Sequence, residues 1–360
     1  MKHLEELIDR FLAYGIPSVD ICVMRHGEVI YRRMEGYSDA ARAKPINGTE
    51  RYNIYSCSKP MTVTAAMRLF ERGEIRLEDN ISDYLPEFSD MEVNDNGNIR
   101  PAKRRITIRD LLSMQAGLTY DLHSDGIRRG QKETGGRCPT REMMRYIASE
   151  PLAFDPGTQY EYSLCHDVIA ALVEVVSGKH FGEYMRDNFF EPLGMHDTTY
   201  LPMPDDIAGL AAQYRYDDKS GRFIPIGGEN EYRLGSEYES GGAGCVMTVN
   251  DYMKFLEGWR TGKTVKRDTL ELFASDQMTS DMRKYFGQRA LGYTYGLGLR
   301  CEYEYSGSSD FGWGGAACSY LACDLKHDFT VFSAQHVLNS PNRHLRDLIA
   351  GVIRNDFSDV

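Results

Sequence analysis

Ser56 and Lys59 stand at the two ends of a Ser-Cys-Ser-Lys tetrapeptide, which Pro60 follows directly. Proline is tolerated in an α-helix only within the first turn, so we expect a helix to begin close to Ser56. A spacing of three then places the serine hydroxyl and the lysine amine on one face of that helix. A serine becomes a nucleophile when a neighbouring base takes its proton. Burial and the positive end of the helix both favour the neutral amine that such a base requires.

The free N–H groups at the same helix start are suited to bind an oxyanion on an acyl carbon that Ser56 attacks. The tetrapeptide therefore predicts nucleophilic acyl chemistry, with Ser56 as nucleophile and Lys59 as base. The alternative at this point is an ordinary helix start that carries a surface lysine.

The elements that position this pair are expected to come from both ends of the chain. The apolar run 52–55 predicts a strand that leads into a helix over 56–72, with Gly73 as its C-cap. Apolar spacing predicts an amphipathic helix at the N-terminus and a hairpin of strands 18–24 and 28–34. Further helices are expected at 108–114, 141–149, 165–177 and 343–354, and further strands at 294–301, 316–323 and 329–335.

Strands at both ends of the chain, with helices between them, predict a mixed α/β fold. Residues 1–85 and 229–360 are expected to form one discontinuous α/β domain. Residues 86–228 are expected to form a mainly helical domain inserted into it.

Six stretches of the chain, taken in order, resemble the serine β-lactamase and penicillin-binding-protein superfamily. The first is Tyr55–Pro60, which holds the Ser-x-x-Lys motif. The others are Glu74–Leu85, Ile106–Leu118, Pro156–Leu164, Gly244–Phe255 and Tyr295–Gly298. The resemblance implies a class C β-lactamase-like fold: an antiparallel-rich sheet flanked by helices, a helical domain beside it, and an active site in the groove between them.

Tyr162, Ser163 and Leu164 lie where the superfamily has its Tyr-x-Asn motif. The resemblance makes Tyr162 a partner base that shares a proton with Ser56 and Lys59. A free tyrosine titrates at about pH 10, so this role at neutral pH requires positive charge nearby. Leu164 departs from the family's asparagine. That change removes an amide that would bind a peptide or lactam substrate, and the resemblance still places Leu164 among the residues expected to contact substrate.

Trp313 opens a Trp-Gly-Gly-Ala run where the superfamily has a Lys-Thr-Gly or His-x-Gly strand. Gly314 and Gly315 let the backbone approach a ligand closely. The resemblance then implies an oxyanion hole made by the N–H groups of Ser56 and Ala316. Trp313 itself offers apolar area and one N–H donor, so we expect it to contact substrate without pairing with an anion.

The Tyr-Ser-Leu and Trp-Gly-Gly departures together resemble the family VIII carboxylesterases, which act on neutral acyl esters. By the same resemblance Tyr120 is expected to line the groove. We therefore predict a serine hydrolase that works through an acyl-enzyme, as a carboxylesterase on small neutral esters. The alternatives are a D-amino-acid peptidase or β-lactamase, an acyltransferase, and a catalytically silent binding protein of the same fold.

The composition of the chain limits the kinds of partner that we expect it to bind. The chain has 42 Lys and Arg against 53 Asp and Glu, a net charge of −11, which disfavours nucleic acid and anionic membranes. No apolar run approaches the roughly 20 residues of a membrane span. The first twelve residues lack the uninterrupted apolar stretch of a signal peptide, so a cytoplasmic location and eight free thiols are expected. A small ester or amide is the expected partner, with no metal or organic cofactor.

Two further pairs of residues are not expected to form sites. His166 and Asp167 are adjacent in a predicted helix, where neighbouring side chains diverge, so they are not expected to form a catalytic dyad. Cys318 and Cys323 are five apart in a predicted strand and are expected to face opposite sides, which disfavours a shared metal.

Overall fold

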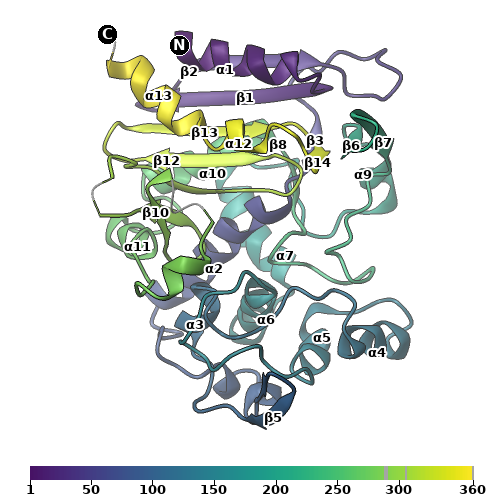
Figure 1. Cartoon of the computed structure of the whole chain (residues 1–360), viewed down its shortest axis with the longest axis vertical. Coiled ribbons are helices and arrows are strands. Elements are labelled where there is room, and N and C mark those ends of the chain that lie inside the picture. The colour runs from purple at the N-terminus through teal and green to yellow at the C-terminus, as the bar shows by residue number, and fades with distance from the viewer. Residues whose placement is uncertain (288–290, 305, 359–360) are drawn as a thin grey trace.

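A seven-stranded antiparallel sheet forms the upper half of the molecule in Figure 1. The computed structural model describes residues 1–287, 291–304 and 306–358. Sheet order is β2-β1-β13-β12-β11-β10-β9, so strands from both ends of the chain meet at its centre. The strands are β1 (Ser18–Arg25), β2 (Glu28–Gly36), β9 (Tyr293–Tyr295), β10 (Arg300–Glu302), β11 (Phe311–Gly314), β12 (Tyr320–Asp324) and β13 (Phe329–Ala334).

Helices cover both faces of this sheet. Side chains alternate along a strand, so Val19, Ile21 and Val23 of β1 face one layer and Cys22 faces the other. The first layer consists of α1 (Lys2–Ala13) and α13 (Ile349–Ser358), which pack together beside the two chain ends (Figure 1). On the second face α10 (Val249–Arg260) packs against β1 and β13. The N-terminal amphipathic helix and the first hairpin were predicted correctly.

The lower half of Figure 1 is mainly helical, and α2 (Lys59–Glu71) runs between the two halves. Ten of the thirteen residues of α2 are buried, and the helix packs against α6 (Cys165–Ser177). One apolar cluster includes residues of α2, α6 and the sheet, so the two halves share a continuous core. Shared packing of this kind fixes α2, and with it the Ser-x-x-Lys motif, relative to both halves.

The remaining elements connect these layers. The helices are α3 (Ile108–Leu112), α4 (Asp125–Glu133), α5 (Thr140–Ile147), α7 (Phe181–Met185), α8 (Glu191–Leu193), α9 (Pro204–Ala208), α11 (Arg267–Phe273) and α12 (Arg343–Arg346). The strands are β3 (Arg51–Asn53), β4 (Glu92–Asp95), β5 (Asn98–Pro101), β6 (Gln213–Asp217), β7 (Arg222–Ile226), β8 (Val246–Thr248) and β14 (Val337–Leu338). Single turns of tighter or wider helix are η1 (Tyr55–Ser58), η2 (Ile81–Asp83), η3 (Pro86–Phe88), η4 (Arg186–Phe190) and η5 (Met282–Tyr285).

Several predicted elements differ from the structure. The strand expected at 294–301 is a hairpin, β9 and β10, because the chain turns between them. The strand expected at 316–323 begins only at Tyr320, so Cys318 lies in a turn and the opposite-faces argument for the cysteines does not apply. The last helix is interrupted between α12 and α13. The stretch 86–228 also contains four strands, and β6 and β7 form a sheet with β14 near the other end of the chain.

All eight cysteines are buried and free. Among the residues that the structure describes, no helix is both long enough and apolar enough to cross a membrane.

Candidate active site

Ser56 lies in the single 3₁₀ turn η1, which continues directly into α2. The predicted helix start is therefore correct to within one turn. Tyr55, just before the serine, has a φ of 49°, a left-handed conformation that costs a bulky residue of order 1 kcal/mol. Its hydroxyl donates to Oε1 of Gln213 at 2.8 Å, which anchors the strained residue. The result is a partly exposed serine on a rigid turn.

Lys59 is fully buried, and its amine touches three groups. Nζ lies 2.8 Å from the carbonyl oxygen of Gly242, 3.2 Å from the hydroxyl of Tyr120 and 3.4 Å from Oγ of Ser56. Burial lowers the pKa of Lys59 to about 7, against an opposing effect of Asp167. A neutral amine has two N–H bonds and one lone pair. Donation to Gly242 and Tyr120 therefore leaves the lone pair available to the proton of Ser56.

Tyr162 is the third member of the predicted triad, and the structure places it beside the other two. Its ring centroid lies 4.4 Å from Nζ of Lys59. Burial raises the pKa of Tyr162, while hydrogen bonds from Ser56 and Trp313 act in the opposite direction. Because burial dominates, Tyr162 is a phenol at neutral pH. A neutral phenol in this place can pass a proton between Ser56 and Lys59, and the neutral amine of Lys59 is chemically suited to act as the base.

Trp313 lies on β11, next to Tyr162. Its side chain is only 7% exposed, and its ring stacks between those of Tyr162 and Phe286. The single indole N–H donates to the Tyr162 hydroxyl at 3.1 Å, so it is not free for a substrate. The structure thus adds a role that the sequence did not indicate: Trp313 supports Tyr162, and its hydrogen bond favours negative charge on the phenol oxygen. A contact between Trp313 and substrate stays a prediction.

The predicted oxyanion donor Ala316 lies in the turn between β11 and β12, directly after Gly314 and Gly315. In the described part of the chain, its N–H makes no hydrogen bond. The turn is closed by Gly315 N–H donating to the Ser319 carbonyl at 2.8 Å. A Cβ at position 315 would overlap the Ser319 hydroxyl and the Ile54 carbonyl, so this close approach requires glycine.

Two side chains tie this turn to its surroundings. The hydroxyl of Ser319 donates to the carbonyl of Ile54 at 2.8 Å, two residues before Ser56. Buried Arg346 donates to the Gly315 carbonyl at 3.0 Å. These contacts hold the Ala316 turn against the chain that carries the serine.

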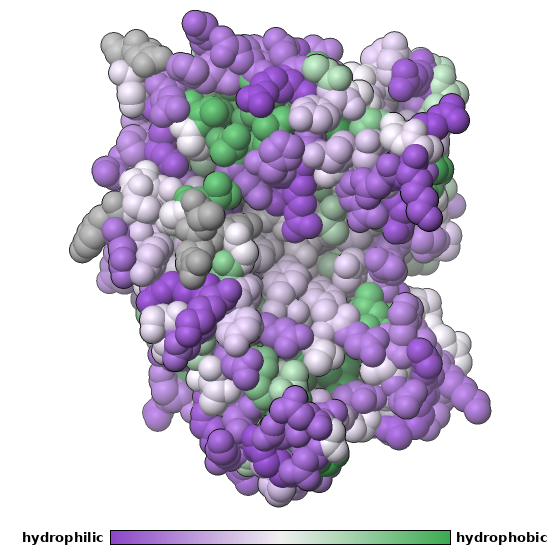
Figure 2. Space-filling view, viewed as in Figure 1, coloured by the Kyte–Doolittle hydropathy of each residue, from purple (hydrophilic) through white to green (hydrophobic). Residues whose placement is uncertain are grey.

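The two remaining predicted site residues, Tyr120 and Leu164, lie in different surroundings. Tyr120, expected to line the groove, contacts the amine of Lys59 and stacks on Tyr162 at a centroid distance of 5.6 Å. Leu164 is 4% exposed and packs in the core, so a substrate contact at this residue stays a prediction. In the space-filling view, a paler and less polar area of surface lies between the two more strongly purple halves of the molecule (Figure 2).

Sequence reasoning missed Asp167 and the Gly242 carbonyl. As expected, His166 and Asp167 diverge: the His166 ring bonds the Leu112 carbonyl at 3.2 Å, whereas Tyr238 donates to Asp167 at 3.1 Å. No local pattern marks the Gly242 carbonyl. The signal for Asp167 was a charged residue in the first turn of a mostly apolar helix, 165–177.

The chain is similar to known proteins in both fold and sequence. The fold is that of EstCE1, described as a hydrolase with promiscuous acyltransferase activity. The two share 26% of residues and a TM-score of 0.79 over 97% of this chain and 98% of that one. A β-lactamase family model matches residues 4–352. The chain therefore belongs to the β-lactamase family, and it is a serine hydrolase of that family.

Other relatives agree with this assignment. Esterase EstB of Burkholderia gladioli is 29% identical over 273 residues, which cover 69% of this chain and 67% of EstB. The fold also matches simvastatin synthase LovD of Aspergillus terreus with a TM-score of 0.81, 21% identity and full coverage of both chains.

Proposed function

We propose that the protein is a carboxylesterase that hydrolyses small uncharged esters through an acyl-enzyme on Ser56. The observation that carries this proposal is the buried amine of Lys59, 3.4 Å from Oγ of Ser56, with its other two contacts already made. The similarity to esterase EstB supports the same conclusion. The Trp313 position offers no charge for a substrate carboxylate, which favours neutral esters over penicillins and D-peptides.

In the first half-reaction Oγ of Ser56 attacks the ester carbonyl while its proton passes to Lys59, directly or through Tyr162. The carbonyl oxygen becomes an oxyanion facing the N–H groups of Ser56 and Ala316. When the tetrahedral intermediate collapses, the carbon–oxygen bond to the alcohol breaks. The alcohol leaves with the proton from Lys59. A water molecule then repeats the sequence, and the acid and free serine result.

The test uses p-nitrophenyl acetate and purified protein. We expect a burst of p-nitrophenol that matches the enzyme concentration, followed by slower turnover. Ser56→Ala and Lys59→Ala should each lose the burst and at least a thousandfold of kcat/KM. A fluorophosphonate probe should label the native protein and not Ser56→Ala. Turnover by Ser56→Ala at the native rate would refute the proposal, and faster hydrolysis of a cephalosporin or a D-Ala-D-Ala peptide would favour the rival substrates.

Acyl transfer is the second candidate, because EstCE1 is described as having this activity. The same acyl-enzyme passes its acyl group to an alcohol when the groove binds that alcohol better than water. Raising the concentration of a primary alcohol at constant p-nitrophenyl acetate should then increase p-nitrophenol release and produce a new ester. Formation of acetic acid alone would leave hydrolysis as the function.

A further inference from the structure

Asp167 carries a carboxyl group in the interior of the protein, close to Lys59. It lies on α6 and is fully buried. Oδ1 accepts from the Tyr238 hydroxyl at 3.1 Å. Burial raises the pKa of Asp167, whereas hydrogen bonds from Ser240, Tyr238 and the Gly242 N–H and the charge of Lys59 act in the opposite direction. Burying an acid costs free energy unless its partners offset that cost, so the position of Asp167 requires an explanation.

Gly242 lies between these two charged groups. A Cβ built on it would lie 2.5 Å from Oδ2 of Asp167 and 3.3 Å from Nζ of Lys59. The two atoms are therefore within about 6 Å, the range over which an opposite charge stabilises an ammonium. The carbonyl of the same residue accepts from Nζ. Only glycine leaves room for the carboxylate, the peptide and the amine to meet.

We propose that Asp167 is a positioning residue for the catalytic lysine: it holds the Gly242 segment against Nζ and neutralises the ammonium that forms when Lys59 takes the serine proton. This inference rests on the proposed function. It gives Asp167 no contact with substrate, because Lys59 and Gly242 lie between it and Ser56. The burial of an acid at this position is then explained by its role as the counter-charge of Lys59.

The negative charge of Asp167 affects one stage of the proposed reaction, the transfer of the serine proton to Lys59. When Ser56 forms its bond to the acyl carbon, the proton it loses turns the Lys59 amine into an ammonium. When the alcohol leaves, that proton goes with it and the amine is restored. Asp167 favours the ammonium form, so it makes Lys59 a stronger base. Burial alone would leave the amine neutral but too weakly basic to take the proton.

The other groups around Lys59 do not supply this charge. Tyr120 and Tyr162 are buried phenols whose pKa values are raised by burial, and they stay neutral. Burial also raises the pKa of the thiols of Cys57 and Cys165. Burial lowers the pKa of His166 to about 3, so this ring is uncharged as well.

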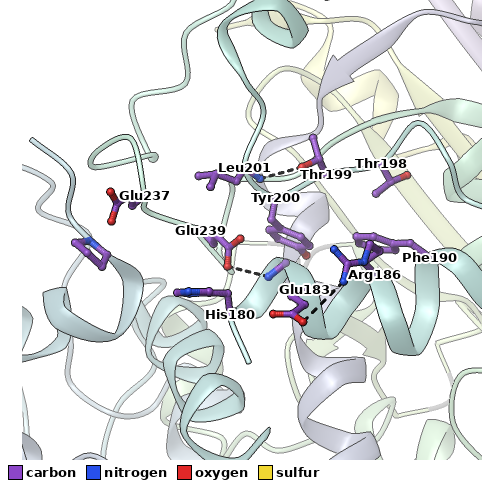
Figure 3. A pocket seen from close by; sticks show the side chains of 12 residues that line it. His180, Glu183, Arg186, Phe190, Thr198, Thr199, Tyr200, Leu201, Glu237 and Glu239 are labelled. Carbon is purple, nitrogen blue, oxygen red and sulfur yellow. Dashed lines mark hydrogen bonds and ion pairs between the residues drawn. The ribbon is translucent and has the colours of Figure 1, made fainter. Parts of the chain in front are cut away.

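A matched control lies on the same segment. Glu239, three residues before Gly242, is also a buried carboxyl, but it accepts from the Gly182 N–H at 2.8 Å on the opposite side. It faces a separate cavity of about 390 Å³ with His180, Glu183 and Tyr200 (Figure 3). Glu239→Gln therefore removes a charge from the same segment without removing it from the surroundings of Lys59.

The experiment measures kcat and kcat/KM for p-nitrophenyl acetate against pH in the native protein, Asp167→Asn and Glu239→Gln. In Asp167→Asn we expect the acidic limb of kcat/KM to move to lower pH by about one unit or more, because the ammonium loses its counter-charge. We also expect the plateau kcat to fall about tenfold, because a less basic amine removes the proton more slowly. In Glu239→Gln the acidic limb of kcat/KM should stay at the pH of the native protein.

A merely structural defect would lower the whole profile without moving the limb. An unmoved limb in folded Asp167→Asn would overturn the inference, as would the same shift in Glu239→Gln. If Asp167→Asn fails to fold, Tyr238→Phe serves instead: it removes a donor to the carboxylate and should give a smaller shift in the same direction, whereas no shift would overturn the inference. If the fluorophosphonate probe fails to label the native protein, the proposed function itself is refuted.

Discussion

Replacing Trp313 with phenylalanine separates two roles for this residue, support of Tyr162 and contact with substrate. Phenylalanine retains a ring between Tyr162 and Phe286 but lacks the N–H that donates to the Tyr162 hydroxyl at 3.1 Å. The lost bond matters most in the transition state, when the phenol oxygen carries negative charge. A hydrogen bond to a charged group contributes about 1.5–3 kcal/mol, so kcat should fall about 10- to 150-fold. KM should change little, because the indole N–H does not face the substrate.

The assay is pre-steady-state and steady-state hydrolysis of p-nitrophenyl acetate, with thermal unfolding to establish that Trp313→Phe is folded. Phe286→Leu is the matched control. It removes the ring on the other side of the indole and leaves the N–H bond to Tyr162, so kcat should stay within a few-fold of native. A rise in KM with native kcat in Trp313→Phe would refute this reasoning and return Trp313 to a substrate-binding role.

Three further predictions concern the lysine and the oxyanion turn. With a Lys59 pKa of about 7, kcat/KM should be lost as pH falls below neutral, because the ammonium cannot take the serine proton; a pH profile flat down to pH 5 would contradict this. Lys59→Met should abolish activity yet raise the melting temperature at pH 7. The pKa of the Lys59 amine is near 10.5 in the unfolded chain and near 7 in the folded protein, so between these pH values the unfolded state binds the proton more tightly. The stability of the native protein therefore falls as pH drops from 10.5 to 7. The melting temperature of the variant should accordingly depend less on pH across this window, and a lower value than native at pH 7 would contradict the prediction. Gly315→Ala should lose at least a hundredfold of kcat, because its methyl group displaces the turn that carries Ala316; native kcat in a folded variant would exclude Ala316 as an oxyanion donor.

Local features of the sequence were sufficient for much of the fold and for the nucleophile. The helix 165–177 was predicted with the observed limits because its apolar run ends in a glycine cap. Strands with local turns, such as the hairpin formed by β1 and β2, were equally accessible. Predictions failed where the chain changes direction without a strong local signal, as in the turn after Gly315 and at the interruption of the last helix.

The sequence by itself determined that Ser56 and Lys59 share one side of a helix start, because their spacing and Pro60 act through local geometry. The motif resemblance added Tyr162 and Ala316 from distant stretches. Only the tertiary structure decided that Trp313 donates to Tyr162 and that Asp167 lies beside the lysine. These contacts join residues more than a hundred positions apart along the chain. Packing of the helical half against the sheet brings them together, and no periodicity in the sequence encodes which buried side chains will meet.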